Sequence, residues 1–431
     1  MIDTKSQNIE KFILSALKES LKTPNLEDSG DLISIKSVGI IGAGTMGGGI
    51  AMNFANVGLS VKIIETDDAK LKSGLKRVRE NYQRSADRGR FPQEQVAERM
   101  NLICGSLSMD DLSSCDLIIE AAFEEITIKK QIFSQLEEIA KPGSILATNT
   151  SGLDINEIAS MTNRTGDVIG LHFFSPANVM KLLEIVQGKH TKANVIKSCI
   201  DIAQMINKVP VLVGVCDGFV GNRILWARQR QAMRLVGEGV MPWDIDKALN
   251  DFGFKMGPFQ MSDLAGLDLG WSKGVNTINP IKDALCEAGR RGQKTGKGYY
   301  DYDEDRNPSP SMETENIIKR ITNAEKITLP KERIVEALIY PMINEGLKIL
   351  DENKAQRASD IDIVWLYGYG WPRNTGGLMY YGDQIGAQRI LEIMKTLSLE
   401  DETIEISRLL IECSQNNTKF LDIVTDGLIA T

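Results

Sequence analysis

Three glycines in the spacing G-x-G-x-x-G, placed directly after a short apolar run, constrain this chain more than any other feature. The run covers residues 38–41, and Gly42, Gly44 and Gly47 follow it. In a strand–turn–helix unit, the first glycine permits the tight turn, the second lets the backbone approach a diphosphate, and the third lets the helix pack on the strand. The diphosphate then lies at the helix N-terminus, which attracts anions. We therefore predict a dinucleotide-binding turn that includes Thr45 and Met46.

An acidic residue, Glu65, stands at the end of the next apolar run, residues 61–64. A carboxylate in this position can accept hydrogen bonds from both hydroxyls of a ribose, and its charge repels a 2′-phosphate. The expected cofactor is therefore NAD and not NADP.

The length and composition limit the class of protein. A chain of 431 residues is too long for one hydrophobic core, so we expect two or three domains. The net charge of −8 argues against nucleic acid or an anionic membrane as the main partner. The six cysteines are scattered without paired spacing, so neither a disulfide framework nor a metal site is expected. Outside the glycine-rich segment, no apolar run approaches the roughly 18 residues of a membrane span.

Between residues 36 and 213, short apolar strands alternate with helical stretches. Strands are expected at residues 38–41, 61–64, 117–120, 144–147, 168–173 and 209–213. This alternation predicts a Rossmann-type α/β domain, with a mostly parallel sheet and helices on both faces. Ahead of it, apolar residues at helical spacing predict a short amphipathic helix that docks on the body, followed by a linker around residues 23–30.

Beyond residue 213, helical periodicity takes over and an internal repeat is visible. Arg223-Ile224 matches Arg333-Ile334, Asp244-Ile245-Asp246 matches Asp360-Ile361-Asp362, and residues 263–266 match residues 383–386. The offset drifts from 110 to 120 residues, as expected for a duplicated helical unit with small insertions. We therefore expect an N-terminal helical extension over residues 1–35 and an NAD-binding domain over residues 36–213. An all-α part made of two tandem repeats would follow, over residues 214–328 and 329–431.

Only two histidines occur, and His172 ends an apolar run at the carboxyl end of a predicted strand, where open α/β sheets bind ligands. Glu184 lies inside a later apolar run, where an unpaired carboxylate is costly to bury. A short turn around residues 175–177 would bring the two strands alongside each other and make His172 the partner of Glu184. The alternative is an ordinary packed histidine, with Glu184 paired to Lys181.

Four further polar residues attract attention, and each also has a purely structural explanation. Ser151 follows a predicted strand, but Ser151-x-x-Asp154 also has the pattern of a capping box for the next helix. Asn222 lies where the sheet gives way to the first long helix, where capping or surface roles are available. Glu124 and Lys129 could flank a nicotinamide ribose, or they could form a solvated helix start.

A basic stretch follows Glu65. Residues 70–90 carry eight basic side chains against two acidic ones, a local charge of +6 in an acidic protein. A polyanionic ligand could bind there, although a charge run of this kind is usually a solvated helix face.

Taken together, these motifs resemble the L-3-hydroxyacyl-CoA dehydrogenase family, and within it the dehydrogenase half of peroxisomal bifunctional enzymes of fatty-acid β-oxidation. The resemblance covers the chain from Val38 to about Gly386. Its most specific segments are residues 38–49, 117–124, 149–151, 170–176, 179–184, 218–223, 253–259, 286–299 and 368–372.

The resemblance implies a role for each candidate residue. His172 would be the general acid/base and Glu184 the carboxylate that orients it, while Ser151 and Asn222 would hold the substrate oxygens. The implied cofactor contacts are Gly42, Gly44, Thr45, Met46, Gly47, Glu65, Glu124, Lys129 and Asn149. The implied substrate is a 3-hydroxyacyl-CoA that is oxidised by NAD, and residues 70–90 coincide with the region where the family holds the CoA nucleotide.

Two differences from the resembled enzymes, and the form of the second repeat, carry expectations of their own. The hydratase half is absent from this sequence, so hydratase activity is not expected. No peroxisomal C-terminal tripeptide or other targeting signal is present, which favours the cytoplasm, whereas the resemblance implies the peroxisome. In the second repeat, Glu332 stands at the position of Asn222, which implies a structural copy. The duplication favours a monomer, with a dimer as the alternative.

Two other functions stay open on the sequence. One is a catalytically inactive homologue that binds NAD or acyl-CoA, which the intact His172, Glu184, Ser151 and Asn222 argue against. The other is a dehydrogenase of a different 3-hydroxy acid, of the 3-hydroxyacid or 6-phosphogluconate type. Those enzymes generally use a lysine base, so a histidine–glutamate pair favours the hydroxyacyl-CoA function.

Overall fold

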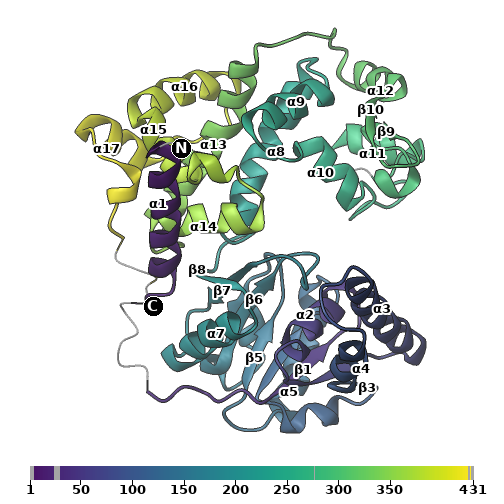
Figure 1. Ribbon diagram of the computed structural model, residues 1–431. Helices are drawn as coiled ribbons and strands as arrows, with labels where there is room; N and C mark the ends of the chain where they lie inside the picture. The colour runs from purple at the N-terminus through teal and green to yellow at the C-terminus, as the bar shows by residue number, and fades with distance from the viewer. Residues whose placement is uncertain (1–3, 24–29, 276, 426–427, 429–431) are drawn as a thin grey trace. The chain divides into compact units, whose positions relative to one another are not determined.

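The computed structural model of the chain describes residues 4–23, 30–275, 277–425 and 428. Two compact units are present (Figure 1). Unit 1 comprises Met1–Arg223, Ile349–Tyr369 and Leu421–Thr431, and unit 2 comprises Ile224–Lys348 and Gly370–Phe420. Within the described residues, no helix has the length and apolar character needed to cross a membrane.

Unit 1 is built on an eight-stranded sheet with the strand order β3-β2-β1-β4-β5-β6-β7-β8. The strands are β1 Ser37–Ile41, β2 Ser60–Ile64, β3 Ile103–Ser106, β4 Leu117–Glu120, β5 Ile145–Thr148, β6 Val168–Phe173, β7 Leu182–Gln187 and β8 Val209–Gly214. All neighbouring pairs are parallel except β6 and β7, which run antiparallel. Every residue of β4 to β7 is buried, as expected for a sheet covered by helices on both faces.

The Rossmann-type sheet predicted from the sequence is therefore confirmed. The six strands expected from apolar runs lie within one residue of their predicted bounds. The strand β3 was not expected, because its sequence, Ile-Cys-Gly-Ser, has only one large apolar residue. The helices of unit 1 are α1 Thr4–Ser20, α2 Thr45–Ala55, α3 Asp68–Asp87, α4 Glu94–Asn101, α5 Ile126–Ile139, α6 Ile155–Ala159, α7 Ala193–Met205 and α14 Ala358–Gly368.

The N-terminal helix α1 docks on unit 1. Its apolar side chains Ile9, Ile13 and Ala16 are buried, and it contacts α14 and β8. Helix α1 thus belongs to the same compact unit as the sheet, in agreement with the expectation that it docks on the body. Most of the predicted linker, residues 24–29, lies outside the described residues.

Unit 2 is mainly helical. Its helices are α9 Pro242–Phe252, α10 Pro258–Ala265, α11 Pro280–Glu287, α12 Met312–Thr322, α15 Leu378–Ile385, α16 Ala387–Glu400 and α17 Arg408–Asn416, with most of α8 Gly221–Gly237 and α13 Lys331–Asp351. An antiparallel hairpin also belongs to this unit and is formed by β9 Tyr300–Tyr302 and β10 Pro308–Pro310. Proline is tolerated in β10 because that strand pairs with β9 alone.

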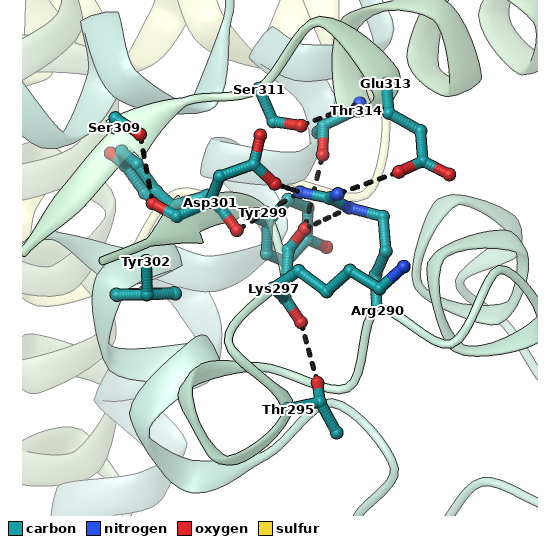
Figure 2. A network of polar contacts seen from close by, with 12 residues as sticks. Arg290, Thr295, Lys297, Tyr299, Asp301, Tyr302, Ser309, Ser311, Glu313 and Thr314 are labelled. Atoms are coloured by element: carbon teal, nitrogen blue, oxygen red, sulfur yellow. Dashed lines mark hydrogen bonds and ion pairs between the residues drawn. The ribbon is translucent and has the colours of Figure 1, made fainter. Parts of the chain in front are cut away.

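A buried arginine ties this hairpin to α12 (Figure 2). Arg290 is 1% exposed, and its guanidinium donates to the carbonyls of Gly298 at 2.8 Å and Tyr300 at 3.1 Å. It also donates to the carboxylates of Asp301 at 2.7 Å and Glu313 at 2.9 Å. The buried charge is therefore balanced by two carboxylates and two carbonyls, drawn from β9, from the residue two positions before it, and from the first turn of α12.

Two buried aspartates organise the other side of the hairpin. Asp246 of α9 accepts hydrogen bonds from the backbone of Phe259 at 3.0 Å and Gln260 at 2.8 Å, and from the hydroxyl of Tyr300 at 2.8 Å. Burial raises the pKa of Asp246 to about 6, against the effect of these hydrogen bonds. Burial likewise raises the pKa of Asp263 to about 6. Asp246 thus ties α9 to both α10 and β9.

Replacing Arg290 by methionine should destabilise the protein by about 3 kcal/mol, because two carboxylates and two carbonyls lose a buried donor. Chemical denaturation measures the change in the free energy of unfolding. The matched control is Arg320→Met, an exposed arginine of α12, for which we expect a change within about 0.5 kcal/mol. Equal stability of the two variants would contradict the structural role of Arg290.

The raised pKa of Asp246 predicts a pH dependence of stability. Its folded pKa of about 6 exceeds the ordinary aspartate value of 3.8, so its stabilising contribution is present below the unfolded pKa and is lost as the pH rises through the folded pKa. Between about pH 4 and about pH 7 this group should remove about 2 kcal/mol from the free energy of unfolding. Denaturation at both pH values should show that Asp246→Asn lacks this loss.

The exposed Asp251→Asn, at the end of the same helix, is the control for that experiment. It should keep the pH dependence of the unsubstituted protein, because its carboxylate remains in solvent in the folded chain. A pH dependence that is the same in Asp246→Asn and Asp251→Asn would show that Asp246 ionises as an ordinary surface aspartate.

Candidate active site

The antiparallel pairing of β6 and β7 places His172 directly opposite Glu184. The Nδ1 atom of His172 lies 2.7 Å from Oε2 of Glu184. Oε1 of Glu184 accepts a second hydrogen bond from the backbone of Gly221 at 2.9 Å. The alternative partner, Lys181, instead donates to the carbonyl of Asn207 at 3.4 Å. Each oxygen of this fully buried carboxylate thus has a donor, and the pairing with Lys181 is wrong.

Aromatic rings surround the imidazole of His172. The ring of Phe174 lies 4.4 Å away and that of Phe219 lies 5.7 Å away, between centroids. The side chain of His172 is only 7% exposed. Because a carboxylate accepts hydrogen bonds and does not donate them, Nδ1 carries the proton in the neutral ring. Nε2 is then the basic nitrogen, free to accept a proton.

Ser151 is held by Glu124. Oε1 of Glu124 accepts from the backbone of Ser151 at 2.7 Å and from its hydroxyl at 2.9 Å, and also from the hydroxyl of Thr150 at 2.7 Å. The capping explanation for Ser151 is wrong, since the N-cap of α6 is Asp154, which accepts from the backbone of Asn156. Ser151 is thus an exposed residue that is oriented by a carboxylate.

Beneath Glu124 lies a buried charge network. The Nζ atom of Lys129 lies 2.8 Å from both carboxylate oxygens of Glu120 and 3.3 Å from Oε2 of Glu124. Lys129 is 1% exposed, so it is not part of a solvated helix start. Burial acts to raise the pKa of Glu124, but the hydrogen bonds from Ser151 and the charge of Lys129 outweigh it and hold that pKa below its usual value. Glu124 therefore stays ionised beside Ser151.

Sequence reasoning missed Glu120, although a signal was present. It is fully buried at the last position of β4 and accepts from the hydroxyl of Thr148 at 2.6 Å. Like Glu184, it is a carboxylate placed in an apolar run, which must find a buried partner. The same argument that singled out Glu184 would have found it.

Asn222 lies next to Ser151 and next to a tyrosine that the sequence did not suggest. Its Nδ2 donates to the carbonyl of Ser151 at 3.2 Å, and its Oδ1 accepts from the hydroxyl of Tyr369 at 2.8 Å. A capping role for Asn222 would therefore not account for its side-chain hydrogen bonds to Ser151 and Tyr369. Asn149, another candidate, accepts from the backbone of Phe173 at 2.9 Å and so joins β5 to the strand of His172.

The glycine motif forms the predicted turn between β1 and α2. Gly42 has a φ of +106°, and a β-carbon there would lie 2.6 Å from the carbonyl oxygen of Ala121. A β-carbon on Gly47 would lie 1.9 Å from the carbonyl oxygen of Gly42, so the third glycine allows the close packing of helix on strand. Gly44 caps α2 with no side-chain hydrogen bond and has open space beside it, which leaves room for a diphosphate at the helix N-terminus.

Two side chains border this turn. Oε2 of Glu65 accepts from the backbone of Ala43 at 3.1 Å, which places the carboxylate at the end of β2 beside the glycines. Arg77, from the basic stretch, donates to the hydroxyl of Thr45 at 3.3 Å. The turn therefore carries the parts that a dinucleotide needs, while Met46 packs against the core of the sheet.

The basic stretch itself forms α3. Two of its lysines make ion pairs along the helix, Lys72 with Asp68 at 2.6 Å and Lys76 with Glu80 at 3.8 Å, and all four side chains are largely exposed. These contacts are those of a solvated helix face. Arg77 is the member of the stretch that reaches a candidate cofactor residue.

Comparisons with known proteins agree with this geometry. Residues 37–216 match a family model described as the NAD-binding domain of 3-hydroxyacyl-CoA dehydrogenase, and residues 218–302 match its C-terminal domain. The first description confirms NAD as the cofactor, and both confirm the family resemblance drawn from the motifs.

The chain is 41% identical over 392 residues to the peroxisomal bifunctional enzyme of Cavia porcellus, a match that covers 83% of this chain and 53% of that protein. The chain thus spans about half the length of the curated relatives it matches. The crystal structure of the dehydrogenase part of multifunctional enzyme 1 from C. elegans is similar with 32% identity and a TM-score of 0.67, over 94% of this chain and 96% of that one. That of 3-hydroxybutyryl-CoA dehydrogenase from Escherichia coli is similar with 25% identity and a TM-score of 0.75, over 89% and 99%.

Proposed function

The chain belongs to the 3-hydroxyacyl-CoA dehydrogenase family, and from this premise we propose that it oxidises L-3-hydroxyacyl-CoA to 3-ketoacyl-CoA with NAD in fatty-acid β-oxidation. The observation that carries the proposal is the 2.7 Å contact between His172 and Glu184, on the neighbouring strands β6 and β7 of the sheet that carries the glycine turn. A buried imidazole that is oriented by a carboxylate is the arrangement of a general base.

His172 acts as the proton acceptor. With Nδ1 held by Glu184, Nε2 removes the proton of the 3-hydroxyl group, and the positive imidazole that results is stabilised by the adjacent carboxylate. Bound NAD would supply the acceptor for the hydride that leaves C3, and the products would be the ketone, NADH and a proton. The backbone hydrogen bond from Gly221 to Glu184 fixes the carboxylate that fixes the ring.

Ser151 and Asn222 orient the substrate. The two residues are in contact, since Nδ2 of Asn222 lies 3.2 Å from the backbone carbonyl of Ser151. Hydrogen bonds from these groups to the 3-oxygen or the thioester carbonyl would align the C3 hydrogen for transfer and favour the transition state. Glu124 keeps Ser151 in place from below.

The cofactor contacts follow from the same unit. Gly42, Gly44, Thr45, Met46 and Gly47 would hold the diphosphate at the start of α2, and Glu65 would accept from the adenosine ribose. Glu124, which is 42% exposed, would contact the nicotinamide side. Lys129 and Asn149 would support the cofactor site indirectly. The side chain of Lys129 pairs with Glu124, and that of Asn149 accepts a hydrogen bond from β6.

The tandem helical repeat is part of this proposal. The helices α9 and α14 both have eleven residues, and α10 and α15 both have eight. In the first copy, Asp263 accepts from the backbone of Tyr299 at 2.8 Å. In the second copy, Asp383, the matching residue, accepts from the backbone of Phe420 at 2.6 Å. Equal helix lengths and an equivalent aspartate contact support a duplication of one helical unit.

The proposed compartment is the peroxisome, as the names of the relatives suggest. The word peroxisomal in the name of the Cavia porcellus relative supports a peroxisomal setting for this chain over a cytoplasmic one. Cell fractionation, with the dehydrogenase activity as the marker, tests this assignment.

The duplication predicts a monomer, because one chain carries both helical units that two copies of a single-repeat chain would supply. Sedimentation equilibrium should give a mass near the 47.7 kDa of one chain. A mass of two chains that persists on dilution would support the dimer and remove this argument.

Replacing His172 by alanine should lower kcat by at least about 100-fold, because the general base is lost. NADH formation from 3-hydroxybutyryl-CoA measures the activity, and the affinity for NAD should be unchanged. His190→Ala is the matched control, since the second histidine is exposed and should be dispensable. Activity that survives in His172→Ala would refute the assignment.

The same assay separates the rival functions. Turnover of the CoA thioester, with little turnover of the free 3-hydroxy acid, supports the proposed substrate class. Binding of NAD and acyl-CoA without NADH formation would instead indicate an inactive homologue. Preference for the free acid would indicate a dehydrogenase of another 3-hydroxy acid.

A further inference from the structure

We infer that Tyr369 is a positioning residue for the reaction, and that its hydroxyl fixes the amide of Asn222 with Nδ2 presented to the substrate oxygen. The inference rests on the proposed function and deepens it. Tyr369 lies 147 residues after Asn222 in the sequence, at the end of the segment Ile349–Tyr369 that belongs to unit 1.

The hydrogen bonds of Asn222 define the orientation of its amide. The carbonyl of Ser151 can only accept, so the group 3.2 Å away from it must be Nδ2. The opposite end is then Oδ1, which accepts from the hydroxyl of Tyr369 at 2.8 Å. The Nδ2 group has two protons, and Ser151 uses one, which leaves the second to donate to a substrate oxygen.

Removing the hydroxyl of Tyr369 would release this arrangement. Oδ1 would lose its donor, while the remaining bond from Nδ2 to Ser151 is long and leaves the amide able to rotate. An amide that is rotated by half a turn presents an acceptor where a donor is needed. It would then repel the developing negative charge on the reacting oxygen.

The ring of Tyr369 also packs against Phe174, the aromatic residue that lies on the imidazole of His172. It meets the ring of Phe174 edge-on at 5.4 Å, and Phe174 packs on His172. A β-carbon on Gly221 would lie 2.4 Å from the Tyr369 ring, so the tyrosine lies close against the residue whose backbone donates to Glu184. One side chain thus touches both the substrate-orienting amide and the surroundings of the base.

The segment that carries Tyr369 is firmly held. Its ring stacks on Trp365 at 4.6 Å with an interplanar angle of 24°, and Trp365 is fully buried. The helix α14 contacts α1, β7 and β8. Tyr369 is therefore placed by packing, and from this position its hydroxyl donates to Asn222.

Tyr369→Phe removes only the hydroxyl and keeps the ring, so the fold and its packing should persist. We expect kcat to fall about tenfold, the size of one hydrogen bond to a group that orients the reaction. The affinity for NAD and the pH dependence of kcat/KM, which reports on His172, should be unchanged. Tyr340→Phe is the control, because it removes a buried hydroxyl from unit 2 and should leave kcat and KM unchanged.

A double-mutant cycle with Asn222→Ala provides the decisive comparison. If Tyr369 acts through the amide, Tyr369→Phe should change kcat by less than about twofold in the Asn222→Ala background. The same tenfold loss in both backgrounds would show that Tyr369 has only a structural role. Equal activity of Tyr369→Phe and the unsubstituted enzyme would also overturn the inference.

These outcomes are separate from a failure of the proposed function. An unsubstituted protein that forms no NADH from any 3-hydroxyacyl-CoA would refute the function itself. An active protein that loses activity in His172→Ala and keeps it in Tyr369→Phe would refute only the role of Tyr369.

Discussion

The contact between His172 and Glu184 is the constraint on which the site depends. It exists because β7 runs antiparallel to β6 in a register that pairs these two residues. A shift of one residue would turn Glu184 to the other face of the sheet. The backbone of Gly221 then takes the second carboxylate oxygen. The reactive imidazole is thus positioned by sheet pairing, which is rigid, and not by a loop.

A second buried charge network serves the neighbouring strands in the same way. The fully buried Glu120 ends β4 and pairs with Lys129, and Lys129 in turn lies near Glu124. Breaking one partner of such a pair is strongly destabilising, since the other charge stays buried. We propose that the buried pair is kept because the charge of Lys129 holds Glu124 ionised beside Ser151, on the side of the site that would face the nicotinamide.

Local sequence signals predicted much of this arrangement, but not all of it. The strands could be predicted, since apolar runs define strands. The carboxylate of Glu184 in such a run signalled a buried partner, but the residues alone left both His172 and Lys181 open, and only the family resemblance favoured His172. The hairpin with Pro308 could not be predicted, because it is held by distant groups such as Arg290 and Asp263. Tyr369 could not either: an aromatic residue at the end of a helical segment gives no local sign of a partner 147 residues away.

The place of Tyr369 also changes what the second helical copy contributes. Under the proposed duplication, Glu332 would stand there at the position of Asn222, so that copy would lack the amide that the first copy uses. Under the proposed duplication, the second copy nevertheless supplies α14, which packs on β7 and β8, and with it the hydroxyl that orients Asn222. The first copy would then supply Asn222, and the second copy would supply Tyr369, whose hydroxyl bonds to it. On this proposal, the second copy would have no site of its own and would instead complete the site of the first copy.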